Sequence, residues 1–131
     1  MYFSTVKTYG NVVSRGYFLH IIGLKRKEIN LYLSSLEKLQ LLPTEKRDLM
    51  FIIGLWYTKN NRFSEALYYF EHAFQNFHET FPYKKEFESV VAAYIECNQI
   101  EKAREVLKYF LKRKTFDKRF IRLEKKYCNL L

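Results

Sequence analysis

The side chains with the clearest chemical potential in this sequence are basic, and they gather near its carboxyl end. Arg104, Lys108 and Lys112 are spaced i, i+4 and i+8, which places them on one face of a helix. The residues after position 100 include 11 Lys or Arg and only 4 Asp or Glu, and this segment carries most of the net charge of +9. Because a basic face attracts polyanions, nucleic acid, an anionic membrane and an acidic protein surface are all candidate partners.

A second basic row is expected on a last helix that begins at Thr115 or Asp117, opposite its apolar stripe. If this helix packs antiparallel to the one before it, the two basic rows form a single surface. The alternative interpretation is a solvated face that only keeps the protein in solution. The candidate surface for an anionic partner comprises Arg104, Lys108, Lys112, Arg113, Lys114, Lys118, Arg119, Arg122, Lys125 and Lys126.

Residues suited to catalysis or metal binding are few and scattered. His20, His72 and His78 fall on different predicted elements, and Cys97 and Cys128 form no CxxC pair. The sequence has no phosphate-binding glycine loop, zinc-protease motif or hydrolase nucleophile elbow. We therefore predict that the protein is not an enzyme and uses no metal and no cofactor.

The composition favours one helical domain over residues 1–131. The chain is 48% apolar, yet it has only 4 Gly and 2 Pro, which argues against the many tight turns of an all-β fold. Neither a secretory leader nor an uncharged apolar run long enough to span a membrane is recognisable. We therefore expect a location in the cytoplasm or another intracellular compartment.

Apolar residues recur with helical periodicity along almost the whole chain, and the pattern predicts an all-α fold. The first ten residues are expected to form an arm. Pro43 ends the second helix in this interpretation, Thr44 and Ser64 are expected to cap the next two helices, and Gly16 is a weak point of the first. The expected helices lie at about 12–22, 27–42, 44–59, 64–77, 87–97, 100–113 and 115–130.

Two consecutive helix pairs carry an internal repeat. In the first of them, small and aromatic residues occur at characteristic spacings, namely Met50, Ile53, Gly54, Tyr57, Ala66, Phe70 and Ala73. This segment, at about 47–80, resembles a tetratricopeptide repeat, and a degenerate second unit follows at about 84–114 with an offset of 37 residues. Residues 12–42 have the length of such a unit without its signature. The resemblance implies a short α-solenoid of antiparallel helix pairs with a C-terminal capping helix.

In tetratricopeptide proteins the first helix of each pair lines a concave partner groove. The resemblance therefore implies a groove that binds a partner helix or an extended peptide. Phe51 and Leu55 stand where carboxylate-clamping members of the family have polar residues, and the alternative is that both belong to the core. The implied groove residues are Asp48, Phe51, Leu55, Thr58, Lys85, Glu88, Ala92 and Ile95.

The second unit also resembles a pentatricopeptide repeat, a family that reads single-stranded RNA. Ser89 would be its base-reading residue, but Ile52 at the corresponding place in the preceding unit cannot hydrogen-bond a base. We therefore predict a non-catalytic protein–protein interaction module, such as a scaffold, adaptor or chaperone-like subunit of a larger assembly. The alternative is RNA or ribonucleoprotein binding through the basic C-terminal helices.

Overall fold

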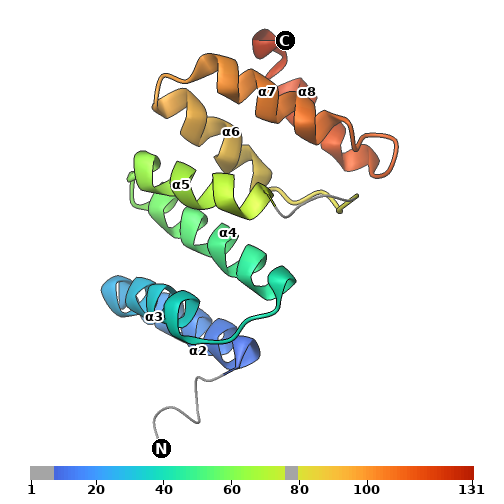
Figure 1. Cartoon of the computed structure of the whole chain (residues 1–131). Helices are drawn as coiled ribbons and strands as arrows, with labels where there is room; N and C mark the ends of the chain where they lie inside the picture. The colour runs from blue at the N-terminus through green and yellow to red at the C-terminus, as the bar shows by residue number, and fades with distance from the viewer. Residues whose placement is uncertain (1–7, 76–79) are drawn as a thin grey trace, which may run out of the picture.

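The computed structural model describes residues 8–75 and 80–131, and all of the regular structure in these ranges is helical (Figure 1). The expected all-α fold is therefore confirmed, while most of the predicted N-terminal arm lies outside the described residues. The elements are α2 (Tyr9–Ile21), α3 (Lys25–Lys38), α4 (Pro43–Lys59), α5 (Phe63–Phe74), α6 (Phe87–Glu96), α7 (Ile100–Leu111), the 3₁₀ helix η1 (Lys118–Phe120), α8 (Ile121–Lys126) and the 3₁₀ helix η2 (Cys128–Leu130).

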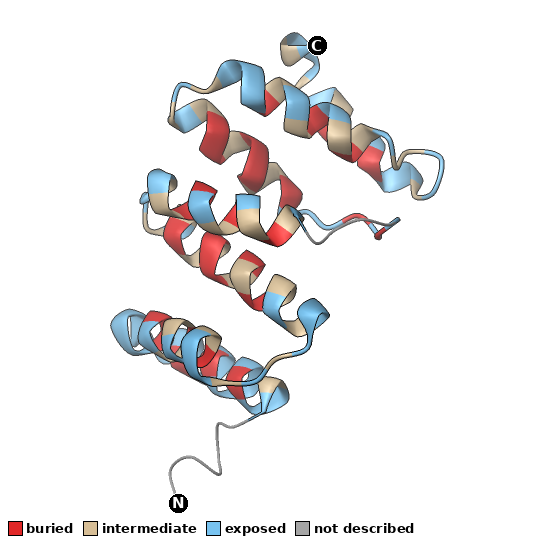
Figure 2. Ribbon diagram, viewed as in Figure 1, coloured by how far each residue is buried: buried red, intermediate tan, exposed pale blue. Residues whose placement is uncertain are grey.

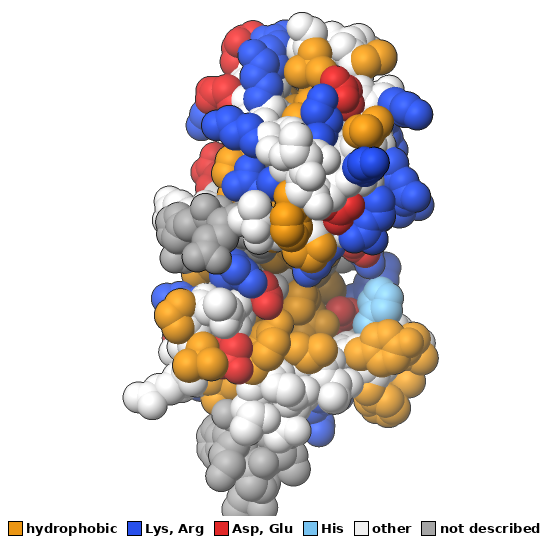
Figure 3. Space-filling view, turned by 90° about the vertical axis from the view of Figure 1, so that its right-hand side faces the viewer, with side chains coloured by type: hydrophobic (Ala, Val, Ile, Leu, Met, Phe, Trp, Pro, Cys, Tyr) orange, Lys and Arg blue, Asp and Glu red, His pale blue; other side chains and the backbone are white. Residues whose placement is uncertain are grey.

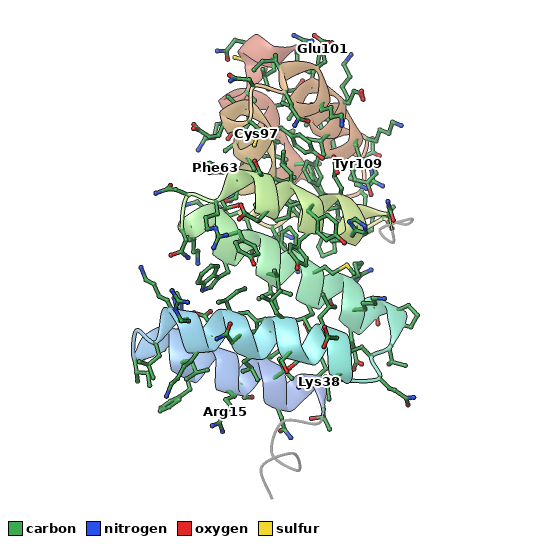
Figure 4. All side chains as sticks on the ribbon, turned by 60° about the vertical axis from the view of Figure 1, so that its left-hand side comes forward. Arg15, Lys38, Phe63, Cys97, Glu101 and Tyr109 are labelled. Carbon is green, nitrogen blue, oxygen red and sulfur yellow. The ribbon has the colours of Figure 1, made fainter. Side chains whose placement is uncertain are left out.

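Neighbouring helices pack as antiparallel pairs, and the pairs stack in chain order into a short solenoid (Figure 1). The pairs are α2–α3, α4–α5 and α6–α7. At the C-terminal end α8 packs against α7 and closes the stack. Figure 4 shows the labelled Phe63, at the start of α5, and Cys97, directly after α6, on the same side of the stack, as the alternating helix directions require.

The turn inside each pair has the same construction. Each contains one residue in the left-handed conformation, Gly23 (φ 81°), Asn61 (φ 60°) or Asn98 (φ 58°), and these lie 38 and then 37 residues apart. Glycine and asparagine adopt this conformation at the lowest cost, so they end helices. The following N–H donates to a carbonyl five residues earlier, from Leu24 to Leu19 (3.0 Å), Arg62 to Tyr57 (2.8 Å) and Gln99 to Tyr94 (2.9 Å).

In two of the three pairs the helices approach each other closely at a glycine. A Cβ atom on Gly54 would lie 2.5 Å from a ring carbon of Phe70, and one on Gly16 would lie 2.4 Å from the Tyr32 ring. In both pairs the aromatic residue follows the glycine by 16 positions, so the same close approach recurs. Gly16 is therefore not the weak point that the sequence predicts, because its missing side chain lets α3 pack against α2.

Several predicted helix ends differ in the structure. Pro43 does not end the second helix, because α3 already stops at Lys38 and Pro43 is the first residue of α4. Proline suits that position, since its missing N–H would have no helical partner. Leu42, not Thr44, is the N-cap, and its N–H donates to the Glu45 carboxylate at 3.0 Å. Ser64 is likewise not a cap, because α5 begins one residue earlier.

The predicted last helix of 115–130 is wrong in length. Asp117 accepts a hydrogen bond from the Arg119 N–H and starts η1, and the α-helical part covers only Ile121–Lys126. The predicted apolar stripe is partly kept, because Phe120 and Leu123 are fully buried. Phe116, however, is exposed outside any helix, so the stripe does not begin there.

An aromatic cluster fills the C-terminal two thirds of the core. Figure 2 shows buried residues along the inner faces of α4, α5 and α6. Phe87 lies at the centre of the cluster, with its ring stacked on Phe110 at a centroid distance of 4.7 Å and on Phe120 at 5.9 Å. Rings from α6, α7 and η1 thus form one stack, which fixes the capping segment on the last helix pair.

The close approach at Gly54 yields a stability prediction. Gly54→Ala places a methyl group against the Phe70 ring, so we expect a loss of about 1–3 kcal/mol in the free energy of unfolding, as for other overpacked cores. Gly10→Ala is the matched control, because a Cβ there meets nothing within 4 Å and alanine favours the helix. Urea unfolding compares the two variants, and equal stability for both would contradict the packing described here.

Candidate functional site

Phe51 is a core residue, so its predicted place in a partner groove is wrong. Only 5% of its surface is exposed. Its ring lies 5.7 Å from Phe70, 5.9 Å from Phe74 and 5.7 Å from Phe87, measured between centroids. The ring therefore fills the junction between the second and third helix pairs, where the sequence predicts an open groove.

Of the other predicted groove residues of α4, two form hydrogen bonds within the helix and one lines a pocket. Thr58 donates a hydrogen bond to the Gly54 carbonyl at 3.0 Å, and Asp48 accepts one from its neighbour Arg47 at 3.0 Å. Both side chains are therefore engaged within α4. Leu55 is only half-buried, and it lines a pocket on the side of α4 that faces α2 and α3.

The predicted groove residues of α6 do not form an open surface. Lys126 of α8 lies 2.8 Å from the Glu88 carboxylate, and the Tyr127 hydroxyl donates to the Glu88 carbonyl at 3.1 Å. The C-terminal segment therefore covers the start of this helix. Ala92 and Ile95 are half-buried, and only Lys85 is fully exposed.

The open site lies at the junction between the first and second helix pairs. A pocket of about 420 Å³ separates the C-terminal half of α2 and the start of α3 from α4. Figure 3 looks onto this hollow in the lower half of the molecule, where hydrophobic side chains form its wall and a histidine stands at its edge. The lining residues are Val13, Tyr17, His20, Lys25, Glu28, Tyr32, Ile52, Leu55, Trp56, Lys59 and Asn60.

The pocket contains the first pair's equivalents of the predicted groove positions. Val13, Tyr17 and His20 lie 38 residues before three groove residues of α4, and this is the offset that separates the Gly23 turn from the Asn61 turn. The sequence pattern does not single out these three residues, because residues 12–42 lack the repeat signature. The signal that could have found them is the recurrence of Gly16 at Gly54.

The size of one side chain explains why this junction is open. Val13 occupies the position that Phe51 occupies in the next pair. The Phe51 ring reaches across its junction to Phe87, whereas valine has no ring to reach across the first junction. Val13 is exposed, and Ile52 and Leu55 on the opposite wall are only half-buried. The first junction is thus left unfilled by the side chains that the structure describes.

One carboxylate lies among these apolar walls. The side chain of Glu28 is only 7% exposed. Its Oε2 accepts a hydrogen bond from the Tyr32 hydroxyl at 3.0 Å, while its Oε1 has no hydrogen-bond partner among the described residues. The His20 Nδ1 atom is 3.4 Å from Oε1, within reach for an ion pair but without hydrogen-bond geometry. One of the two carboxylate oxygens therefore accepts no hydrogen bond from the described residues.

The candidate surface for an anionic partner is only partly open. Half of its ten basic side chains are engaged within the molecule, so they stabilise the C-terminal segment. Arg113 lies over the rings of Tyr109 and Phe81, at 4.2 and 4.5 Å from the centroids. Arg119 makes two hydrogen bonds to Asp117, and these, with one from the Tyr83 N–H, lower the pKa of that carboxyl. Arg104 binds the Leu130 carbonyl and Glu101, Lys114 pairs with Glu124, and Lys126 with Glu88.

The remaining five basic side chains form no ion pair with the residues that the structure describes. All five are exposed, and Figure 3 shows Lys and Arg side chains spread over the upper half of the molecule with acidic ones among them. The predicted surface is therefore reduced to Lys108, Lys112, Lys118, Arg122 and Lys125.

No family model, no curated protein and no solved structure matches this chain. The tetratricopeptide likeness consequently stays a prediction that rests on residue spacing. Within 8–75 and 80–131, no helix is both long and apolar enough to cross a membrane. The same residues include no group of three His, Cys, Asp or Glu side chains that could hold a metal ion.

The Tyr32–Glu28 pair makes stability depend on pH in the alkaline range. Burial, and then the Glu28 charge and hydrogen bond, raise the pKa of Tyr32 far above its ordinary value of 10.0. Above pH 10 the unfolded chain loses this proton while the folded chain keeps it, so we expect the free energy of unfolding to fall as pH rises. Solvent at the pocket mouth keeps the slope below the about 1.4 kcal/mol per pH unit of one fully coupled group.

Urea unfolding between pH 8 and pH 11.5 measures this slope. Tyr32→Phe is the comparison, because it removes the titrating group and keeps the ring that packs on Gly16. We expect a shallower alkaline decline in this variant than in the wild type. Identical declines would show that Tyr32 does not hold its proton in the folded state.

Proposed function

We propose that the protein is a non-catalytic interaction module, an adaptor or scaffold subunit, that binds an apolar segment of a partner protein in the pocket between α2, α3 and α4. The observation that carries the proposal is the open apolar junction itself. Its wall combines Val13 and Tyr17 of α2 with Ile52, Leu55 and Trp56 of α4. A pocket of about 420 Å³ accommodates one or two large side chains of a helix or an extended peptide.

The outer surface of α2 supports the same proposal. Val13, Tyr17 and Ile21 are spaced i, i+4 and i+8, so they form an apolar row that leads out of the pocket. Tyr17 is 66% and Ile21 63% exposed, and Phe18 beside them is also exposed. A contiguous row of exposed large apolar side chains is typical of a surface that another chain covers.

A photo-crosslinking amino acid at Val13 tests the proposed site, because this residue is both exposed and part of the pocket wall. We expect a discrete protein adduct in native extract. The matched control carries the crosslinker at Ser34, an exposed position of α3 that does not line the pocket. Leu55→Arg in the Val13 variant should abolish the adduct and leave the helicity intact, as circular dichroism would show.

Equal adducts from Val13 and Ser34, or an adduct that survives Leu55→Arg, would contradict binding at this junction. Nuclease treatment of the extract separates a direct protein contact from one that nucleic acid bridges. An adduct that disappears with nuclease would favour RNA or ribonucleoprotein binding instead.

Binding of RNA or another polyanion through the C-terminal surface is a second candidate function. The observation that favours it is the set of five exposed basic side chains on α7, directly after it at Lys112, and on η1 and α8, none of which forms an ion pair with the described residues. Contacts with phosphates release counterions, so affinity falls steeply as the salt concentration rises. An acidic protein surface would use the same side chains without reading bases.

Charge removal tests this second candidate. The test variant combines Lys108→Gln, Lys112→Gln and Lys125→Gln. We expect it to flatten the plot of log affinity for single-stranded RNA against log salt concentration by an amount that corresponds to about two phosphate contacts or more. Because these side chains are exposed, stability should change little. The matched control removes three cations that are paired within the molecule, Lys114, Arg119 and Lys126, and should change the salt dependence less, because their charges already face Glu124, Asp117 and Glu88. Absence of RNA binding at low salt in the wild type would exclude this function.

A further inference from the structure

We propose that the pocket at the first junction selects a basic group, the ammonium or guanidinium of a lysine or arginine side chain on the partner's apolar segment, and holds it on Glu28. This inference rests on the proposed function, since it names the chemistry of the ligand that the same pocket takes. It makes Glu28 a binding residue and Trp56 a wall of the site.

The first argument is the state of the carboxylate. A buried charge is costly unless it is paired and hydrogen-bonded. The Glu28 side chain is only 7% exposed. Its Oε2 accepts the hydrogen bond from Tyr32, yet none of the described residues forms a hydrogen bond with Oε1. Oε1 is itself buried, with the His20 Nδ1 atom 3.4 Å away, so a ligand donor reaches it when the His20 side chain moves aside. A cationic donor forms the stronger bond because it also neutralises the charge.

The second argument is that the fold does not need a carboxylate there. The Glu28 N–H donates to the Leu24 carbonyl at 3.0 Å, one turn after the Gly23 turn. Residues 66 and 103 make the same bond after the other two turns, at 3.1 and 2.9 Å, and both are fully buried alanines. The repeat thus places a small apolar residue at this site in the two other pairs. Only the pair that borders the open pocket has a carboxylate.

The third argument is the shape and chemistry of the wall. Ile52 and Leu55 offer an apolar surface for the methylene stem of a long basic side chain. Tyr17 and Trp56 add aromatic rings, which attract cations more than they attract anions. A lysine or arginine inserted from the partner would therefore bury its stem on α4 and bring its charged head to the carboxylate.

The cations of the pocket itself do not reverse this preference. Lys25 and Lys59 line the pocket but are exposed, so water screens their charges, whereas Glu28 acts from a region of low dielectric. His20 is half-exposed at the rim, and its contact to Oε1 lacks hydrogen-bond geometry, so a better donor can displace it. The two lysines instead disfavour a polycation and favour a single basic residue in an apolar context.

Three small probes with one phenyl ring and different polar ends test the proposal. They are 2-phenylethylammonium, 2-phenylethanol and 3-phenylpropanoate. The chain has one tryptophan, Trp56, which lines the pocket, so its fluorescence reports binding without a label. We expect the full-length protein to bind the ammonium about tenfold more tightly than the alcohol, and the carboxylate most weakly.

Glu28→Gln keeps the size of the side chain and an acceptor for Tyr32 but removes the charge. In this variant we expect the three affinities to agree within about twofold, because the selecting charge is gone. Glu37→Gln is the matched control, since it makes the same charge change at an exposed position of α3 outside the pocket. It should leave the tenfold preference unchanged.

A measurement on the wild-type protein tests the proposal even if the Glu28→Gln variant does not fold. The side-chain carboxyl carbon resonance of Glu28 should move on addition of 2-phenylethylammonium and not on addition of the alcohol. Equal binding of the three probes by the wild type, no response of Trp56 to any of them, or a preference that survives Glu28→Gln would overturn the inference. Each of these outcomes leaves the Val13 adduct unaffected, so failure of the cation site is distinguishable from failure of the proposed function.

Discussion

The stack of rings around Phe87 is the interaction on which the rest of the structure depends. This side chain is 1% exposed and contacts rings from α4, α5, the segment before α6, α7 and η1. A large aromatic residue buries about 150–250 Å², and each ring pair adds some further stabilisation. Because one residue joins so many elements, the second and third helix pairs and the capping segment form one packed body. The stack also holds α8 in place although this helix has only six residues, because Phe120 directly before it packs on Phe87.

The two junctions of the solenoid show how one repeat position can either close a core or open a site. Phe51 closes the second junction by joining the Phe87 stack, whereas Val13 at the equivalent position leaves the first junction open. The backbone is alike in both pairs, since the turns at Gly23 and Asn61 share their left-handed residue and their hydrogen bond. The difference between the filled and the open junction thus comes from the size of one side chain, while the backbone of the two turns is the same.

The sequence predicts the helices and their pairing well because both follow from local periodicity and turn residues such as Asn61 and Asn98. It fails where one side chain has two uses. An apolar residue on the first helix of a pair, such as Phe51, is compatible with a groove or with the core. Only the contact with the Phe87 ring, which the sequence does not show, places it in the core. A run of basic residues predicts an open surface, although Arg113 lies over the ring of Phe81, which is distant in sequence. Arg119 is held by its neighbour Asp117, and Asp117 is itself fixed by a bond from the distant Tyr83 N–H. The predicted last helix is too long because apolar periodicity alone does not show at which residue a helix ends.

Glu28 illustrates what the repeat itself can reveal once the turns fix the register. Helical periodicity treats it as an ordinary charged residue at the start of α3, where acidic residues favour the helix dipole. Alignment on the Gly23, Asn61 and Asn98 turns instead places it with Ala66 and Ala103, both fully buried. A carboxylate in place of a buried alanine lowers stability unless something binds it, and Tyr32 engages only one of its oxygens. The fold uses one carboxylate oxygen, through Tyr32, and the residue that replaces the repeat's buried alanine is also the one that lines the open pocket.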